Sequence, residues 1–167
     1  MMNIYTYLKK DHRAVSALME EVLSTHNPEK QEELFERIKE ELELHADTEE
    51  KTFYVAIKNK GGKLLKEKED HAEEEHAEIR NFLKQIEVAK PGSNDWLIAF
   101  GELKHAVEHH VEEEESDIFE KAKKVLSDAQ AYELALEMDE MKKDKQRHKG
   151  LGKNSNDGKT LLQRIIF

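Results

Sequence analysis

The chain of 167 residues contains no cysteine. This absence excludes disulfide bonds, thiolate zinc sites, cysteine nucleophiles and iron-sulfur clusters held by cysteine. Imidazole nitrogen and carboxylate oxygen remain as metal ligands, and the chain has nine histidines and 37 acidic residues to supply them. Any bound metal ion must therefore be held by nitrogen and oxygen.

Long hydrophobic runs are also missing. The opening MMNIYTYLKKDH lacks the continuous apolar stretch of a signal peptide, and no segment approaches the roughly 18 apolar residues that a membrane span needs. Basic residues number 27 against 37 acidic ones, a formal net charge of -10, so nucleic acid and anionic membranes are not expected partners. The composition predicts a soluble, cytoplasmic, single-domain protein.

The two prolines and seven glycines fall mostly between stretches of helical periodicity. Those stretches cover about residues 4–22, 34–57, 64–86, 97–122 and 127–150. Gly61 and Gly62 suit a left-handed cap at the end of the second helix. Asn94 or Asp95 can cap the start of the fourth helix, and Ser127 the start of the fifth.

Four long helices with short connections predict an all-α fold, an antiparallel up-down-up-down four-helix bundle with an additional C-terminal helix and tail. The fifth helix, with Tyr132 and Leu136 on its apolar side, is expected to be shorter and to close near Gly150. We expect the bundle and this helix to occupy residues 1–150 and the tail residues 151–167, whose role the sequence leaves open.

Histidine and glutamate interrupt the apolar faces where a core residue is due. In the second stretch the apolar series that contains Leu42 continues with His45 and Glu49, and in the fourth stretch His110 and Glu114 follow in the same way. The first and third stretches each carry one histidine on the apolar side. The six inward polar residues are His12, His45, Glu49, His76, His110 and Glu114.

The two halves of the chain repeat each other. DHRAVSALMEEV superposes on EHAEIRNFLKQI, and HADTEEKTFY superposes on HVEEEESDIF. From His12 to His45 is 33 residues, and from His76 to His110 is 34. One helical hairpin used twice predicts a pseudo-two-fold bundle with a site on its axis.

The spacing of these residues permits metal binding. Residues four apart on a helix lie about 40° apart around the axis and about 6 Å apart along it, so an imidazole and a carboxylate can hold one ion together. A set of four histidines and two glutamates suits iron, manganese or zinc rather than calcium or magnesium. Without an ion, each buried carboxylate would cost several kcal/mol.

A single histidine on an apolar stripe is usually a satisfied core residue, and an acidic run such as Glu112 to Glu115 is usually a solvated helix face. Four inward histidines with two matching glutamates, present in both halves, are poorly explained by independent accidents. The pattern as a whole favours a metal site.

With these motifs the chain resembles the hemerythrin-like, HHE cation-binding domain family. The family pattern is a histidine on the first helix, HxxxE on the second, a histidine on the third and HxxxE on the fourth, and here it covers about residues 4–125. The resemblance implies a non-haem di-iron centre bridged by both glutamates and by an oxo or hydroxo group. It assigns one iron mainly to His12 and His45. It assigns the other to His76 and His110, with O2, NO or peroxide at an open position.

The chain departs from the oxygen-carrying hemerythrins. Those proteins have a second histidine one turn before the helix-three ligand, where this chain has Ala72. The adjacent His71 points about 100° away, so it is a possible additional ligand only if the helix is distorted. They place a carboxylate five residues after the helix-four histidine, where this chain has Glu115, but the apolar stripe favours Glu114. A site with one ligand fewer keeps more exchangeable positions, which favours redox chemistry or sensing over reversible oxygen carriage.

Other polar residues are weaker candidates. His109 points about 100° away from His110, and with His105 it is expected outside the site. Glu50 and Glu115 are expected either to accept hydrogen bonds from imidazole N–H groups or to be solvated.

Rival readings remain open at this level. A ferritin-like carboxylate oxidase has a Glu-x-x-His signature that Glu73 and His76 mimic, as do Glu102 and His105. A module that stores or buffers iron or zinc, and a metal-free interaction bundle, are the others. Tyr54 and its repeat equivalent Phe119 are expected to pack. No residue designates a general acid, a base or a redox-partner surface, so whether the protein turns over a substrate stays open.

Overall fold

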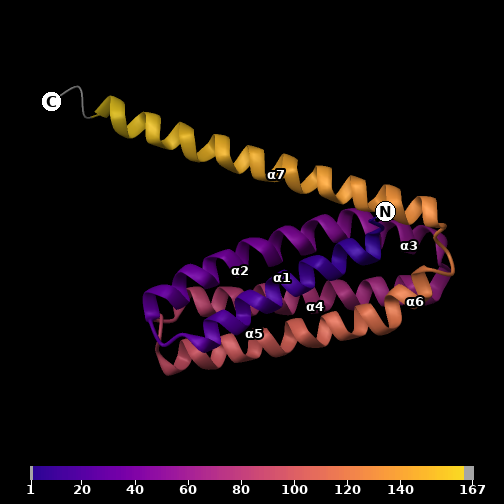
Figure 1. Cartoon of the computed structure of the whole chain (residues 1–167), viewed down its shortest axis with the longest axis horizontal. Helices are drawn as coiled ribbons and strands as arrows, with labels where there is room; N and C mark the ends of the chain where they lie inside the picture. Colours follow the sequence, from indigo (N-terminus) through magenta and orange to yellow (C-terminus); the bar gives the residue numbers. More distant parts are fainter. Residues whose placement is uncertain (1, 164–167) are drawn as a thin grey trace.

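Four long helical segments form an antiparallel bundle in the computed structural model, which describes the backbone of residues 2–163 and the side chains of residues 2–150. The bundle consists of α1 (Ile4–Ser24), α2 (Pro28–Glu49) continued by η1 (Glu50–Tyr54) and α3 (Val55–Lys60), α4 (Gly62–Val88), and α5 (Asn94–Glu113) continued by η2 (Glu114–Ile118) and α6 (Phe119–Ala122). A further helix, α7 (Asp128–Gln163), packs along α1 and α2 (Figure 1). The predicted all-α bundle with an additional C-terminal helix is confirmed.

The helix ends follow from local chemistry. Gly62 has a φ of 64°, the left-handed conformation predicted for the corner between the second and third bundle segments. At α5 the prediction was wrong by one or two residues, because the cap is Ser93 and not Asn94 or Asp95. The Ser93 hydroxyl accepts a hydrogen bond from the backbone N–H of Trp96 at 3.2 Å, and Asn94 is already helical.

The apolar core is divided into two clusters, one toward each end of the bundle. Phe53 and Phe119 belong to one cluster, and Trp96 and Phe100 belong to the other; each is at most 1% exposed. Burying a side chain of this size contributes about 1.5–3 kcal/mol relative to leaving it exposed. Two such clusters hold the four segments in a fixed register.

The polar residues predicted to face inward lie between these two clusters. On α1, for example, Leu8 belongs to one cluster and Val15 to the other, and His12 lies between them. All six residues of the predicted set are buried. The apolar clusters therefore enclose a polar layer across the middle of the bundle.

Two π-helical turns, η1 and η2, interrupt the second and fourth segments, where the sequence pattern predicted regular α-helix. Each follows directly after or includes one of the two inward glutamates, since η1 starts one residue after Glu49 and η2 starts at Glu114. A π turn inserts one extra residue, so Phe53 and Tyr54 after Glu49 are both buried. Such turns are frequent at functional sites.

Helix α7 differs from the prediction in length and in register. It begins after Ser127, whose hydroxyl accepts from the backbone N–H of Gln130 at 3.2 Å, as predicted. It does not end near Gly150 but continues to Gln163, and the side chains of the predicted tail, 151–167, lie outside the described residues. The expected apolar side is also wrong, because Leu136 is 49% exposed. The face that packs on the bundle is Ala131, Leu134, Ala135 and Met138.

A buried lysine fastens α7 to the bundle. Lys142 is 8% exposed, pairs with the carboxylate of Asp11 on α1, and lies 5.0 Å above the ring of Tyr7. The contact joins the added helix to a residue that neighbours the polar layer. Across residues 2–163, no helix is both long and apolar enough to cross a membrane.

Candidate metal centre

The six inward residues form two triads in the polar layer of the bundle. His12 from α1, His45 from α2 and Glu114 at the start of η2 make the first triad. Glu49 at the end of α2, His76 from α4 and His110 from α5 make the second. Within each triad the ligand atoms lie within 4.8 Å of one another, and all six residues are buried. These are two buried groups of the size that one ion each would occupy.

Each carboxylate reaches histidines of both triads. The two oxygens of Glu114 divide between them: Oε1 lies 3.3 Å from Nε2 of His12, and Oε2 lies 3.4 Å from Nε2 of His110. Oε2 of Glu49 lies 3.5 Å from Nε2 of His45 and 3.4 Å from Nε2 of His76. The arrangement places both carboxylates between the two pairs of histidines, as a binuclear metal site requires.

Every histidine turns Nε2 inward because Nδ1 is held by a second carboxylate. Nδ1 of His12 lies 2.8 Å from Glu115, that of His45 2.9 Å from Asp11, that of His76 2.8 Å from Glu50, and that of His110 2.7 Å from Glu75. A carboxylate at Nδ1 fixes the N–H on that nitrogen and leaves Nε2 as the lone-pair donor. The four carboxylates thus orient all four imidazoles for metal binding.

Two of these four carboxylates were not identified from the sequence. Glu50 and Glu115 were considered, and the structure places both on imidazole nitrogens. Asp11 and Glu75 were missed, although each immediately precedes an inward histidine and the two superpose in the internal repeat. Each bonds the histidine of the adjacent helix rather than its own neighbour, and that inter-helix partner is not readable from spacing.

The inner carboxyls carry unequal charge in the metal-free protein. Burial, together with the nearby Glu114, raises the pKa of Glu49 well above its usual range. Burial also raises the pKa of Glu114, but hydrogen bonds with His110 and His12 outweigh it and lower this pKa well below its usual range. Without an ion, therefore, one of the two carboxyls holds a proton.

The histidines are shifted in opposite directions. Burial lowers the pKa of His45 to about 4. Burial acts the same way on His110, but hydrogen bonds with Glu114 and Glu75 overcome it and raise the pKa of His110 to about 9. The triads therefore hold a neutral and a charged imidazole at neutral pH, an interior whose charges the protein alone does not balance.

Several buried polar atoms of the centre have no hydrogen-bond partner in the protein. They are Nε2 of His12, Nε2 of His45, both oxygens of Glu49 and Oε1 of Glu114. Buried polar groups are normally satisfied, and each unsatisfied one costs about 1–3 kcal/mol. Because all of these atoms are metal-ligand atoms aimed into one layer, the donor set fits two metal ions of the first transition row.

Tyr54 contacts the centre, although the sequence pattern predicted only packing. Its hydroxyl donates a hydrogen bond of 2.5 Å to Oε2 of Glu114, and the residue is 1% exposed. The repeat equivalent, Phe119, has no hydroxyl, and both oxygens of Glu49 lack a hydrogen-bond partner. The pseudo-two-fold symmetry of the centre is broken at this position.

Replacing Tyr54 by phenylalanine is expected to destabilise the protein by about 1.5–3 kcal/mol, the usual worth of a hydrogen bond to a charged group, while metal content stays unchanged. Thermal unfolding and elemental analysis measure the two effects. Tyr5→Phe is the matched control, because the Tyr5 hydroxyl is buried without a partner. Equal destabilisation by the two substitutions would contradict the role of the Tyr54 hydroxyl.

The remaining histidines considered from the sequence lie outside both triads. His71 is exposed and its Nε2 lies 3.5 Å from Glu75, because Ala72 and not His71 occupies the inward face of α4. His105 and His109 are exposed on α5, as expected. His71 thus contributes to neither triad.

A small cavity adjoins the centre. Its volume is about 30 Å³, and the four inward histidines are among its lining residues. Apolar side chains complete the wall: Val15, Leu42, Ala46, Ile79, Val107 and Val111. A cavity of this size holds one or two water-sized groups.

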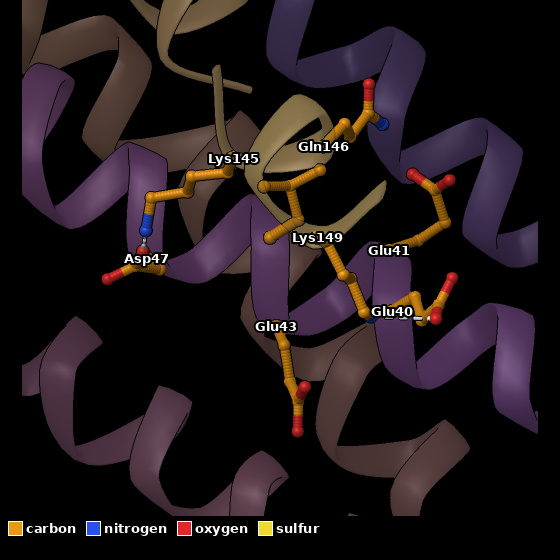
Figure 2. Close-up of a pocket in the computed structure, with 8 residues that line it drawn as sticks. Glu40, Glu41, Glu43, Asp47, Lys145, Gln146 and Lys149 are labelled. Carbon is orange, nitrogen blue, oxygen red and sulfur yellow. Dashed lines mark hydrogen bonds and ion pairs between the residues drawn. The ribbon is translucent and has the colours of Figure 1, made fainter. Parts of the chain in front are cut away.

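A larger pocket lies on the surface between α2 and α7 (Figure 2). It has a volume of about 240 Å³ and contains none of the triad residues. Figure 2 shows Lys145 paired with Asp47 and Lys149 paired with Glu40 across it. Exposed pairs of this kind contribute about 0–1 kcal/mol each, so we interpret the pocket as the edge along which α7 docks.

The comparisons with known proteins agree with this geometry. The family model described as the hemerythrin HHE cation binding domain matches residues 3–122. A DNA nickase from Nostoc sp. is 29% identical over 152 residues, which cover 89% of this chain and 42% of that protein. This chain therefore spans less than half the length of that relative. The crystal structure of a hemerythrin HHE cation binding domain-containing protein from Mycobacterium kansasii matches with a TM-score of 0.75 and 25% identity, over 86% of this chain and 87% of that one.

Proposed function

The chain belongs to the hemerythrin HHE cation-binding domain family, and from this premise we propose that it is a non-haem di-iron protein that binds, reduces or senses O2, NO or peroxide. The observation that carries the proposal is the pair of buried triads with carboxylates shared between them. Imidazole and carboxylate ligands without thiolate suit iron among the first-row metals. Two irons in these positions would supply one-electron redox chemistry and exchangeable coordination positions.

The protein's own residues divide the work of holding the metals. His12 and His45 would hold one iron, and His76 and His110 the other. The carboxylates at the four Nδ1 atoms fix the tautomer of each imidazole, which strengthens its Nε2 as a ligand. Tyr54 holds a proton against Glu114, on one side of the centre only.

The cavity supports a small ligand. Its volume of about 30 Å³ admits a diatomic molecule or peroxide and excludes most metabolites. Apolar walls such as Val107 and Ile79 keep bulk water away from the site, which strengthens the electrostatic interactions inside it. We propose a small oxygen or nitrogen species as the partner, and no nucleic acid, since the net charge is -10.

Sensing or redox chemistry fits better than oxygen carriage. Ala72 occupies the position of the extra histidine of the oxygen carriers and is 1% exposed in the apolar core. His71 next to it faces outward and leaves that position without a protein ligand. One protein ligand fewer leaves an additional exchangeable position at the centre. The redox partner is not specified by any feature of the described surface.

The ferritin-like alternative has little support in the structure. Its Glu-x-x-His signature would require inward carboxylates at Glu73 and Glu102, and both are exposed, as is His105. A role in storing or buffering iron or zinc stays distinct from the proposal through metal content and spectrum.

Elemental analysis of the purified protein is expected to give close to two irons per chain. The oxidised protein should then show near-ultraviolet charge-transfer bands that dithionite bleaches, that air restores, and that NO alters. One zinc per chain, without such bands, would favour buffering instead. Undiminished thermal stability of a preparation with no metal would favour an interaction bundle and contradict the proposal.

A further inference from the structure

The HxxxE spacing of the centre occurs a second time on the outside of the bundle. Two further pairs have it, one on α4 and one on the neighbouring α5. Together these residues form the α4–α5 cluster, which consists of His71, Glu75, His109 and Glu113. The sequence analysis treated both histidines only as candidates for or against the central site. Their side chains instead face one another across the two helices.

The four ligand atoms of the α4–α5 cluster alternate between nitrogen and oxygen. Nε2 of His71 lies 3.5 Å from Oε1 of Glu75 and 3.4 Å from Oε2 of Glu113. Nε2 of His109 lies 3.4 Å from Oε1 of Glu75 and 4.0 Å from Oε2 of Glu113. A tetrahedral ion with metal-ligand distances of about 2.0–2.2 Å holds its ligands about 3.3–3.6 Å apart. Three of the four separations already match.

A buried atom without a partner points into the α4–α5 cluster. Glu75 is 8% exposed, and its Oε2 is engaged by Nδ1 of His110 at 2.7 Å. Its Oε1 is buried and has no hydrogen-bond partner, although it lies closest to the two outer histidines. An unsatisfied carboxylate oxygen costs free energy unless a cation meets it. This observation is independent of the spacing of the cluster.

The internal repeat shows what a satisfied version looks like. Asp11 is the repeat equivalent of Glu75 and accepts a hydrogen bond from Nδ1 of His45 in the same way. Lys142 of α7 brings its ammonium group to Asp11. Helix α7 packs on α1 and α2, so no such lysine reaches Glu75. A divalent ion at Glu75 would take the place that the Lys142 ammonium has in the first half.

We propose that the α4–α5 cluster is a third, mononuclear site for a divalent transition metal ion, with zinc the ion that its two nitrogens and two oxygens favour. Lys68 engages the other oxygen of Glu113, Oε1, at 2.9 Å and leaves Oε2 for the ion. His71 and His109 are exposed, so the ion exchanges with solvent. Through Glu75 it also polarises the carboxylate that orients His110, one of the central histidines.

Zinc titration of the full-length protein, as purified, tests the proposal. Calorimetry and equilibrium dialysis count the zinc bound per chain, and iron is measured before and after. Wild type is expected to take up one zinc more than His71→Ala with His109→Ala, while the iron content of the two proteins is the same. His105→Ala, an exposed histidine on the same helix outside the cluster, is the matched control and should bind as wild type.

The comparison between variants stays informative whatever the central site contains, since only the difference of one equivalent is at issue. Absorption by Co²⁺ provides a second readout, because a tetrahedral ion with two imidazoles gives visible bands that the double variant should lack. Equal zinc uptake by wild type and the double variant would overturn the proposal. So would a loss of iron that accompanies the loss of zinc, because the histidines would then serve the central site.

Discussion

Protein that carries Glu49→Ala together with Glu114→Ala is expected to lose the metal ions of both triads. Each triad contains one carboxylate, and each carboxylate lies within 3.5 Å of histidines from both triads. Removing both leaves four imidazoles with no negative charge among them, a set that holds a divalent ion poorly. The single substitutions should lower metal content by less, since one shared carboxylate remains. Elemental analysis after purification and dialysis gives the numbers of metals.

Glu43→Ala together with Glu112→Ala is the matched control. Both glutamates are exposed, and each lies on the same segment as one of the inner carboxylates. This variant removes the same two charges from the same two segments and should keep its metals. Full metal content in the variant without the inner carboxylates would refute their assignment as shared ligands.

The inner residues could be predicted from the sequence because burial and helical periodicity are both local properties. A histidine such as His45 that falls on the same stripe as Leu42 must face the core whichever helix lies opposite. The internal repeat then showed that the same substitution for a core residue occurs twice. That agreement between two halves, and no single residue, made the metal centre predictable.

The carboxylates that orient the imidazoles could not be predicted in the same way. Asp11 bonds a histidine 34 positions away and Glu75 one 35 positions away, each on the next helix. Which of many surface-facing acids reaches an imidazole depends on how far the two helices are rotated against each other, and spacing along one helix does not contain that rotation. The position of α7 failed for a similar reason, since its apolar face is weak and Lys142 contributes to its docking.

The π turns were missed because no sequence signal for them exists at the level of apolar periodicity. After Glu49, a regular α-helix would bury Phe53 and rotate Tyr54 toward the side. The extra residue of η1 keeps both inside, and so Tyr54 reaches Glu114. The energetic reason is packing and a buried hydrogen bond, which are settled by the neighbouring segments.

Removal of the metal ions is expected to lower the unfolding temperature by about 8–16 °C. An ion at 1,000 times its dissociation constant stabilises a folded protein by about 4 kcal/mol, and about 1 kcal/mol corresponds to about 2–4 °C for a chain of this size. The structural reason is that the metal-free centre keeps unsatisfied atoms in the core, including both oxygens of Glu49, which is 0% exposed. Calorimetric scans before and after chelation measure the change.

The metal-free protein should also become less stable as the pH rises from about 6.5 to about 9. His110 has a folded-state pKa of about 9 against an ordinary value of 6.5, so the charged imidazole stabilises the fold fully below 6.5. That contribution is lost as the pH approaches 9. Glu49 acts in the same direction, because its raised pKa means that ionisation at higher pH charges a buried carboxyl. The metal-loaded protein should show less of this decline, since coordination keeps His110 unprotonated throughout.

Glu49→Leu separates the cost of the carboxylate from the benefit of the metal. In the metal-free protein this substitution should raise the free energy of unfolding by about 1–4 kcal/mol, because an unpaired buried charge is replaced by an apolar group of similar volume. Under metal-replete conditions the same variant should be less stable than wild type, because it binds metal weakly. A reversal of sign between the two conditions is the signature of a carboxylate that the fold retains for its ion. Destabilisation of equal size in both conditions would mean that Glu49 supports the bundle by itself, through its contacts with His45 and His76.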